Sequence, residues 1–261
     1  KTSELTFVDI ISGKFFIWKK KILKSFNLPY KISCLLPYKD KGNWIATSKN
    51  KILKISIKHK IIKSKVIRTI KEPKQNRFND GKCDYLGRLW LSSMDSQEKV
   101  PSGQLWFLKS LAKPKIMDKK FIIGNGIDWS PNNKILYFTA SDKRIIYSYL
   151  FNIKTGKLSN KKIAIKTPKK RGYPDGICTD SQGFIWVAYW DGGCVIRHSA
   201  NGKIDKVIKL PIKRPTSLSF GGKNLNLLFI TSAKTFNKKN HKTEKNSGNV
   251  FVVKTNVKGK K

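Results

Sequence analysis

The sequence predicts an all-β protein, a six-bladed β-propeller, and two observations carry that prediction. A turn followed by an alternating apolar strand recurs five times in the 261 residues, and helical periodicity is hard to find anywhere. The five segments are YKDKGNWIATS, DYLGRLWLSSM, WSPNNKILYFTA, DSQGFIWVAYW and FGGKNLNLLFITSA. Their turn residues lie about 40–50 residues apart, the length of one four-stranded blade. These turn residues are Gly42, Gly87, Asn133, Gly183 and Gly222.

The first blade is predicted to be incomplete. The stretch SELTFVDIISGKFFIW aligns only with the later strands of a repeat, because FVDI matches the YFTA and WVAYW strands and no inner strand precedes it. The chain also begins at Lys1 instead of a Met, so we expect its natural N-terminus to lie upstream. Five whole repeats and this partial one give six blades, expected as a single domain over residues 1–261.

The charge and the cysteine content limit which partners and which cellular compartment are expected. The net charge is +39, yet the lysines are scattered through turns and polar strand faces, which indicates compositional bias more than a nucleic-acid partner. No apolar run approaches the roughly 18 residues of a membrane helix, so we expect no membrane partner. The four cysteines form no C-x-x-C pair and fit small buried thiols, which favours a reducing, cytoplasmic location.

Polar side chains recur at one register position of the repeats. Counting eight residues back from the turn residues of three repeats leads to an oxygen-bearing side chain each time: Asn79, Asn125 and Asp175. Thr216 holds the equivalent place before a longer turn. Each triplet alone would be an ordinary turn, but in a propeller the same position on each inner strand points at one level of the central channel. Such oxygens suit a divalent cation, with Ca²⁺ the first choice and Zn²⁺, Mg²⁺ or Mn²⁺ as alternatives.

These motifs resemble the gluconolactonase/regucalcin (senescence marker protein) family of sugar lactone hydrolases. The resemblance runs from Phe7 to about Gly259 and rests on FVDI, NRFNDGKCDYLGRLW, GNGIDWSPNNKILYF, YPDGICTDSQGFIWVAYWDGGCVIR and FGGKNLNLLFITSA. It implies a six-bladed propeller with a metal at its axis. It also implies hydrolysis of a sugar lactone, such as gluconolactone, to its aldonic acid by metal-activated water.

The resemblance assigns roles motif by motif. Asn125 and Asp175 resemble the family's metal ligands, and Asp175 would also accept the proton of the attacking water. Arg77 and Asn79 resemble its substrate-binding pair, with Asn79 near the metal. Asp80 is expected behind them as an acceptor that orients its neighbours.

Two departures from the family pattern stand out. The third protein ligand, a Glu in an N-terminal GE-x-P-x-W stretch, should lie a few residues before Lys1 and is absent. Either the chain is truncated or it has lost this ligand, and we expect truncation, because the inner strand that would carry the Glu is absent too. The family often has an acidic residue three positions after Met94, where this chain has Gln97. A Gln still bonds hydroxyls, so we expect Gln97 to bind substrate with an altered preference.

Other interpretations stay open. The chain could be a non-catalytic Ca²⁺-binding regulatory propeller, a basic binding module for acidic partners, or a hydrolase of a different ester. Asp128 and Asp180 are expected to be turn or strand-end caps. The three histidines have neither zinc nor triad spacing, so surface or packing roles are expected for them: His59, His198 and His241.

Overall fold

The computed structural model describes residues 4–39, 41–58, 61–111, 113–237 and 242–260. Within these ranges the chain is built of strands, apart from a single short 3₁₀ turn. It divides into two compact units, Lys1–Gly124 and Asn125–Lys261, and the single domain expected from sequence stays a prediction. His59 and His241 lie outside the described residues. No helix in the described part is long and apolar enough to cross a membrane.

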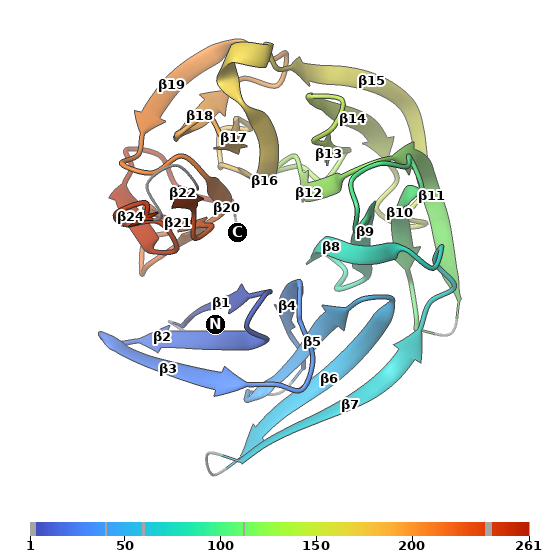
Figure 1. Ribbon diagram of the computed structural model, residues 1–261. Coiled ribbons are helices and arrows are strands. Elements are labelled where there is room, and N and C mark those ends of the chain that lie inside the picture. Colours follow the sequence, from blue (N-terminus) through green and yellow to red (C-terminus); the bar gives the residue numbers. More distant parts are fainter. Residues whose placement is uncertain (1–3, 40, 59–60, 112, 238–241, 261) are drawn as a thin grey trace. The chain divides into compact units, whose positions relative to one another are not determined.

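The first unit holds three antiparallel sheets, coloured blue to green in Figure 1. The first sheet has three strands, as the sequence predicted: β1 (Leu5–Asp9), β2 (Lys14–Lys19) and β3 (Ile22–Asn27). The second has four: β4 (Cys34–Pro37), β5 (Asn43–Ser48), β6 (Lys51–Lys58) and β7 (Ile61–Thr69). The third also has four: β8 (Asn76–Cys83), β9 (Leu89–Asp95), β10 (Gly103–Leu108) and β11 (Pro114–Phe121).

The remaining sheets follow in chain order. One contains β12 (Gly124–Trp129), β13 (Ile135–Ala140), β14 (Ile145–Phe151) and β15 (Leu158–Lys166). The 3₁₀ turn η1 (Lys169–Arg171) leads to β16 (Tyr173–Thr179), β17 (Ile185–Trp190), β18 (Cys194–His198) and β19 (Ile204–Lys209). The last sheet contains β20 (Pro215–Gly221), β21 (Leu227–Ser232) and β24 (Val250–Lys254), and β22 (Phe236–Asn237) pairs separately with β23 (Lys242–Thr243). The last repeat therefore forms a three-stranded sheet in the described residues, where the sequence suggested a whole blade.

The five repeated turn residues share one backbone conformation. Each lies between the first and second strand of its sheet with a positive φ: Gly42 (84°), Gly87 (75°), Asn133 (54°), Gly183 (85°) and Gly222 (80°). Glycine adopts this left-handed region without a steric cost, and Asn tolerates it better than most residues. The periodic signal in the sequence therefore corresponds to a repeated turn.

Apolar side chains of consecutive sheets pack together inside each unit. One cluster of the first unit includes Phe15, Trp44 and Leu53, and another includes Phe78, Leu91 and Trp106. Two clusters of the second unit are centred on Val187 and on Trp186. Trp44, Trp90, Trp106 and Trp186 are all buried.

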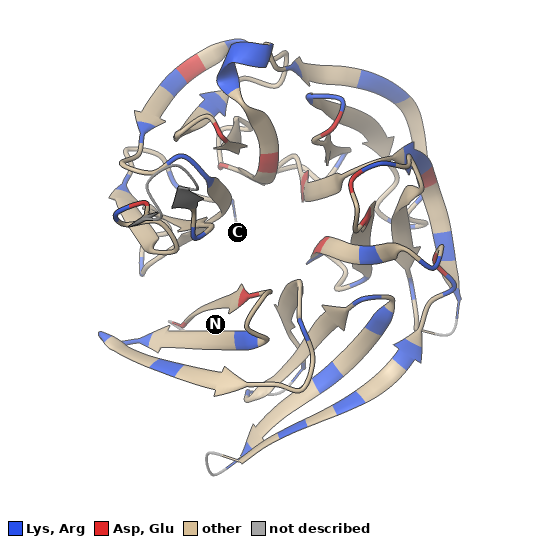
Figure 2. Ribbon diagram, viewed as in Figure 1, with Lys and Arg blue, Asp and Glu red and all other residues tan. Residues whose placement is uncertain are grey.

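Lysines occupy the outer strands of the four-stranded sheets. β7, β11, β15 and β19 are the edge strands, and Figure 2 shows basic residues along them. Exposed examples are Lys63, Lys65, Lys115, Lys161, Lys162, Lys206 and Lys209. Charged side chains on an edge strand keep its unpaired backbone groups from pairing with another chain. Part of the +39 charge thus has a structural role.

Candidate active site

The inner strand β8 carries a β-bulge at Asn79. Its neighbours Phe78 and Asp80 pair with successive residues of β9, Ser93 and Ser92, which leaves Asn79 outside the ladder. A bulge bends its strand and re-aims the side chain of the extra residue, and bulges are common beside active sites. The position selected by counting along the sequence is therefore structurally distinct.

Two further inner strands break register at the equivalent position. In β16 the irregular step follows Pro174 and includes Asp175. In β20 it follows Pro215 and falls on Thr216. All three bulged strands are the first of their sheets, so three of the four register positions, those of Asn79, Asp175 and Thr216, fall on a local irregularity. Asp175 and Thr216 are both half-buried.

Glycines next to the two predicted metal ligands allow the inner strands to approach closely. A Cβ at Gly126 would lie 2.8 Å from the carbonyl oxygen of Asp175, and a Cβ at Gly176 would lie 2.7 Å from the Cα of Ser217. No side chain fits at either position, so β12 packs directly on β16 and β16 on β20. The preceding residues, Asn125 and Asp175, are thereby brought onto neighbouring strands.

A buried hydroxyl joins these two strands. Asn125 Nδ2 donates a 3.2 Å hydrogen bond to Ser141 Oγ, and Ser141 Oγ donates a 2.6 Å bond to the carbonyl oxygen of Pro174. Asn125 is 8% exposed and Ser141 4%. The side chain of Asn125 is therefore linked to the peptide bond that precedes Asp175. Because its nitrogen is used in this bridge, the Oδ1 oxygen is the end that can face a cation.

Sequence reasoning missed Ser141. It follows the apolar strand β13, and a lone serine after an apolar run carries no signal of its own. Its importance depends on the proximity of β12 and β16, which only the folded chain shows.

In the first unit, Arg77 fixes the side chain of Asn79. Arg77 Nη1 donates to Asn79 Oδ1 at 2.8 Å and to the carbonyl oxygen of Phe78 at 3.1 Å. Asn79 Nδ2 donates to the carbonyl oxygen of Gly124 at 3.0 Å. Both ends of the Asn79 amide are thus held, and the structure brings the predicted substrate-binding pair into contact.

Asp80 turns back on its own strand. Its Oδ1 accepts a 2.6 Å hydrogen bond from the backbone N–H of Gly81, and its own N–H donates to Ser92 Oγ at 3.1 Å. These contacts fix the backbone directly after the bulged Asn79. The predicted orienting role of Asp80 stays a prediction.

Gln97 lies in an exposed turn after β9. The Asp95 carboxylate organises this turn, because it accepts hydrogen bonds from the N–H groups of Gln97, Lys99 and Val100. The bonds from Lys99 and Val100 are the main cause of the lowered pKa of Asp95. The backbone that carries Gln97 is therefore fixed, and substrate binding by its side chain stays a prediction.

The structure confirms Asp180 as a turn cap and extends its role. Its Oδ1 accepts from the N–H groups of Gln182 and Phe184, and its Oδ2 accepts from Trp186 Nε1 and Arg197 Nε. Both members of the Asp180–Arg197 ion pair are buried.

Asp128 does more than cap a strand end. Its Oδ2 accepts from the backbone N–H of Thr179 at 2.7 Å, and its Oδ1 accepts from Lys260 Nζ. This buried carboxylate therefore joins β12, β16 and the C-terminal segment. Sequence reasoning missed that role, because Lys260 is distant in the chain.

The two side chains predicted to bind a metal, Asn125 and Asp175, both offer oxygen donors. Among the described residues, no group of three or more His, Cys, Asp or Glu side chains comes together. The pair from Asn125 and Asp175 combines an amide with a carboxylate, which is the donor chemistry of Ca²⁺ sites. Ca²⁺ takes six to eight ligands, so these residues fit as part of its coordination shell.

The chain is similar to known proteins over most of its length. The family model described as SMP-30/Gluconolactonase/LRE-like region matches residues 1–234. Regucalcin of Danio rerio is 34% identical over 238 residues, covering 89% of this chain and 80% of that protein. Human regucalcin is 32% identical over 243 residues, with coverage of 89% and 80%.

Solved structures show the same architecture. A luciferin-regenerating enzyme superposes with a TM-score of 0.89 at 28% identity, covering 99% of this chain and 90% of that one. Regucalcin from Agrobacterium tumefaciens, described as a calcium-binding protein, gives 0.85 at 21% identity, with coverage of 97% and 90%. Each of the six main sheets is one blade, and the fold is a six-bladed β-propeller, as the sequence predicted.

Proposed function

We propose that this chain, which belongs to the SMP-30/gluconolactonase/LRE-like family, hydrolyses a sugar lactone to its aldonic acid. The observation that carries the proposal is the repeated bulge, which sets polar residues of three inner strands outside their ladders. Family membership supports a lactonase-like activity, and the oxygen donors of Asn125 and Asp175 support a divalent cation at the site.

The proposal gives Asp175 two roles. Together with Asn125 Oδ1 it holds the cation, for which we propose Ca²⁺. When bound, such a cation polarises a carbonyl oxygen and lowers the pKa of water. Asp175 accepts the proton of the attacking water. It lies on a bulge of β16, and a bulge re-aims the side chain that it carries.

Arg77 and Asn79 bind the lactone in this proposal. The Arg77 guanidinium, which lies against Asn79, donates to ring hydroxyls or to the developing oxyanion. A preorganised donor of this kind typically stabilises a transition state by about 3 kcal/mol. Gln97 adds an amide that matches a hydroxyl-rich substrate better than an apolar one.

The test compares Asp175→Asn with Asp205→Asn. Asp205 is an exposed carboxylate of the same unit, with a side chain that is 42% exposed, so this control makes the same chemical change away from the site. Asp175→Asn should lower kcat/KM for gluconolactone by about 10²–10⁴-fold, the usual contribution of a general base. Calorimetry without substrate should show weakened Ca²⁺ binding in the same variant, and Asp205→Asn should match the wild type in both measurements.

Two results would contradict the proposal. Turnover by Asp175→Asn at the wild-type rate would remove Asp175 from the mechanism. Ca²⁺ binding by the wild type without turnover of any lactone in a panel would favour a calcium-binding regulator instead.

A further inference from the structure

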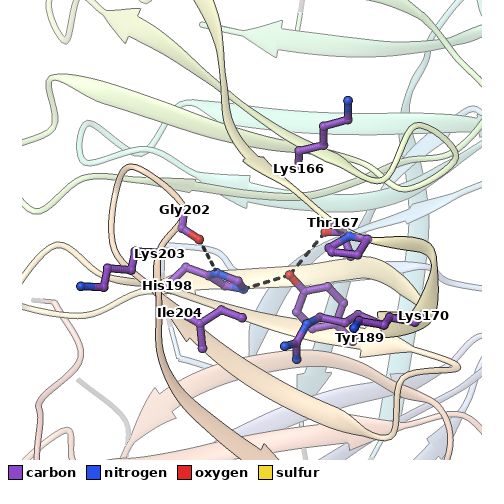
Figure 3. A pocket seen from close by; sticks show the side chains of 10 residues that line it. Lys166, Thr167, Lys170, Tyr189, His198, Gly202, Lys203 and Ile204 are labelled. Carbon is purple, nitrogen blue, oxygen red and sulfur yellow. Dashed lines mark hydrogen bonds between the residues drawn. The ribbon is translucent and has the colours of Figure 1, made fainter.

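A cavity of 510 Å³ lies in the second unit, and none of the bulged residues lines it. It is bounded by the end of β15, the turn η1 and the turn that joins β18 to β19, and Figure 3 shows it from close by. Three buried polar side chains form its floor, and four cations stand around it. None of the residues that line it is acidic. The predicted lactone site uses none of these residues.

The floor is a continuous hydrogen-bonded chain (Figure 3). Thr167 Oγ1 lies 3.4 Å from the Tyr189 hydroxyl, which lies 2.9 Å from His198 Nε2, and His198 Nδ1 lies 3.1 Å from the carbonyl oxygen of Gly202. A carbonyl only accepts, so Nδ1 carries the proton and Nε2 of the neutral ring accepts from the Tyr189 hydroxyl. Thr167, Tyr189 and His198 are each at most 5% exposed.

In the part of the chain that the structure describes, the cations of the walls have no acidic partner. Lys166, Lys170 and Lys203 are exposed and Arg171 is half-buried, and among the described residues none of the four forms an ion pair. A second cavity of 290 Å³ is also lined by Lys170 and Arg171 and adds Lys209. Like charges around one concave surface raise the local positive potential, which favours the binding of an anion.

Arg171 lies close enough to Tyr189 and His198, on the floor of the cavity, to change their pKa values. Burial raises the pKa of Tyr189 to about 12 and lowers the pKa of His198, and the positive charge of Arg171 lowers both pKa values. The guanidinium therefore acts electrostatically on the two buried groups. Arg171, the Tyr189 hydroxyl and the carbonyl oxygen of Gly202 are thus the groups that act on the His198 ring.

The turn that carries two of the cations is anchored. Arg144 Nη1 donates to the carbonyl oxygens of Lys169 and Gly172 at the two ends of η1. Gly172 has a φ of 79°, and a Cβ there would lie 2.2 Å from the carbonyl oxygen of Trp190. The turn is thus pinned to the sheet, which limits the ordering cost when a ligand binds.

We propose that this cavity binds a small molecule that carries a phosphate group. A phosphate dianion offers three acceptor oxygens and enough charge to engage Arg171 and several lysines together, which a single carboxylate does not. The cavity is larger than a phosphate ion, so the rest of the molecule lies over Pro168 and Ile204, which contribute apolar surface to its rim. This site is independent of the proposed lactone hydrolysis.

The first test is calorimetry at low ionic strength with inorganic phosphate and phenyl phosphate, and with benzoate as the carboxylate comparison. Lys170→Gln/Arg171→Gln should weaken phenyl phosphate binding by about tenfold or more, since charge-assisted hydrogen bonds are lost. The matched control is Lys134→Gln/Lys157→Gln, which removes the same charge from exposed positions of the same unit outside the cavity. It should bind as the wild type does.

NMR of the histidines provides a readout on the intact protein. The chain has three histidines, so the His198 signal is identified by its loss in His198→Gln. Phenyl phosphate should move this signal and raise the pKa of His198, because a bound anion offsets the charge of Arg171, and it should leave the other two signals in place. Equal weakening by both double variants, equal binding of benzoate, or tighter binding of a DNA duplex with no His198 shift would overturn the proposal in favour of a diffuse basic surface.

Discussion

The hydroxyl of Ser141 provides a sharp test of how the inner strands are held together. It donates to the carbonyl oxygen of Pro174 at 2.6 Å and accepts from Asn125 Nδ2 at 3.2 Å. Ser141→Ala removes both bonds and leaves a buried amide and a buried carbonyl without this partner. A typical intramolecular hydrogen bond contributes about 1 kcal/mol net, and a buried group left unpaired costs about 1–3 kcal/mol. We therefore expect a loss of about 2–3 kcal/mol in the free energy of unfolding.

The adjoining strand offers a matched control. Thr139, in β13, is fully buried, and its Oγ1 has no hydrogen-bond partner among the described residues. Thr139→Val keeps the shape of the side chain and removes a hydroxyl that makes no bond. This change should be neutral or slightly stabilising, because burying an unpaired hydroxyl is unfavourable.

Urea unfolding monitored by tryptophan fluorescence measures the free energy of unfolding of both variants, and thermal melts measure their melting temperatures. If the cost is about 2 kcal/mol, the melting temperature of Ser141→Ala should fall by roughly 4–8 °C for a chain of this size. Under the proposed function its Ca²⁺ affinity should also fall by about 10–100-fold, the usual effect of losing a group that orients a ligand. The reasoning would be refuted if Ser141→Ala were as stable as Thr139→Val.

Three further predictions concern other buried contacts. Asp180→Ala should destabilise the protein by about 3–5 kcal/mol because it removes the buried carboxylate that pairs with the Nε of the buried Arg197, whereas loss of the exposed Asp205 partner should cost under about 1 kcal/mol; equal urea midpoints would contradict this. Gly176→Ala should cost about 1–3 kcal/mol and reduce lactone turnover, because the added Cβ overlaps β20; unchanged kinetics and stability would count against that packing. The lowered pKa of His198 means that the unfolded chain binds a proton first, so stability should decline as pH falls below about 6.5, and His198→Gln should flatten that decline in thermal melts.

The repeat could be predicted from sequence because it depends on the residues of short local segments. Turn residues with positive φ and alternating apolar strands are properties of short segments, and they were enough to predict the first two strands of each repeat. The register count led to Asn79, Asn125, Asp175 and Thr216, and at three of them, all but Asn125, the structure shows an inner strand that breaks register. Ser141 could not be found this way, because its partners come from two other strands.

The last sheet shows a different limit. Its segment FGGKNLNLLFITSA carries the same turn and strand pattern as the others, yet three strands form in the described residues, with β22 and β23 inserted ahead of β24. The pattern reports the first two strands of a repeat and says little about the outer ones. Outer strands are exposed and rich in lysine, so the alternation that marks a half-buried strand is weakest there.

Lysine itself shows why composition alone could not locate the cavity. On the edge strands a lysine is solvated and serves mainly to prevent strand pairing. Its role there follows from its place in a local strand pattern. Around the cavity, Lys166, Lys170 and Lys203 stand beside Arg171 because β15, η1 and the β18–β19 turn meet there. What separates the two groups is their surroundings: the cavity has a floor of three buried, mutually bonded polar side chains, and its walls include no carboxylate. The net charge of +39 therefore includes lysines dispersed over the edge strands and lysines gathered at the proposed anion site. Only their proximity in three dimensions distinguishes the two groups.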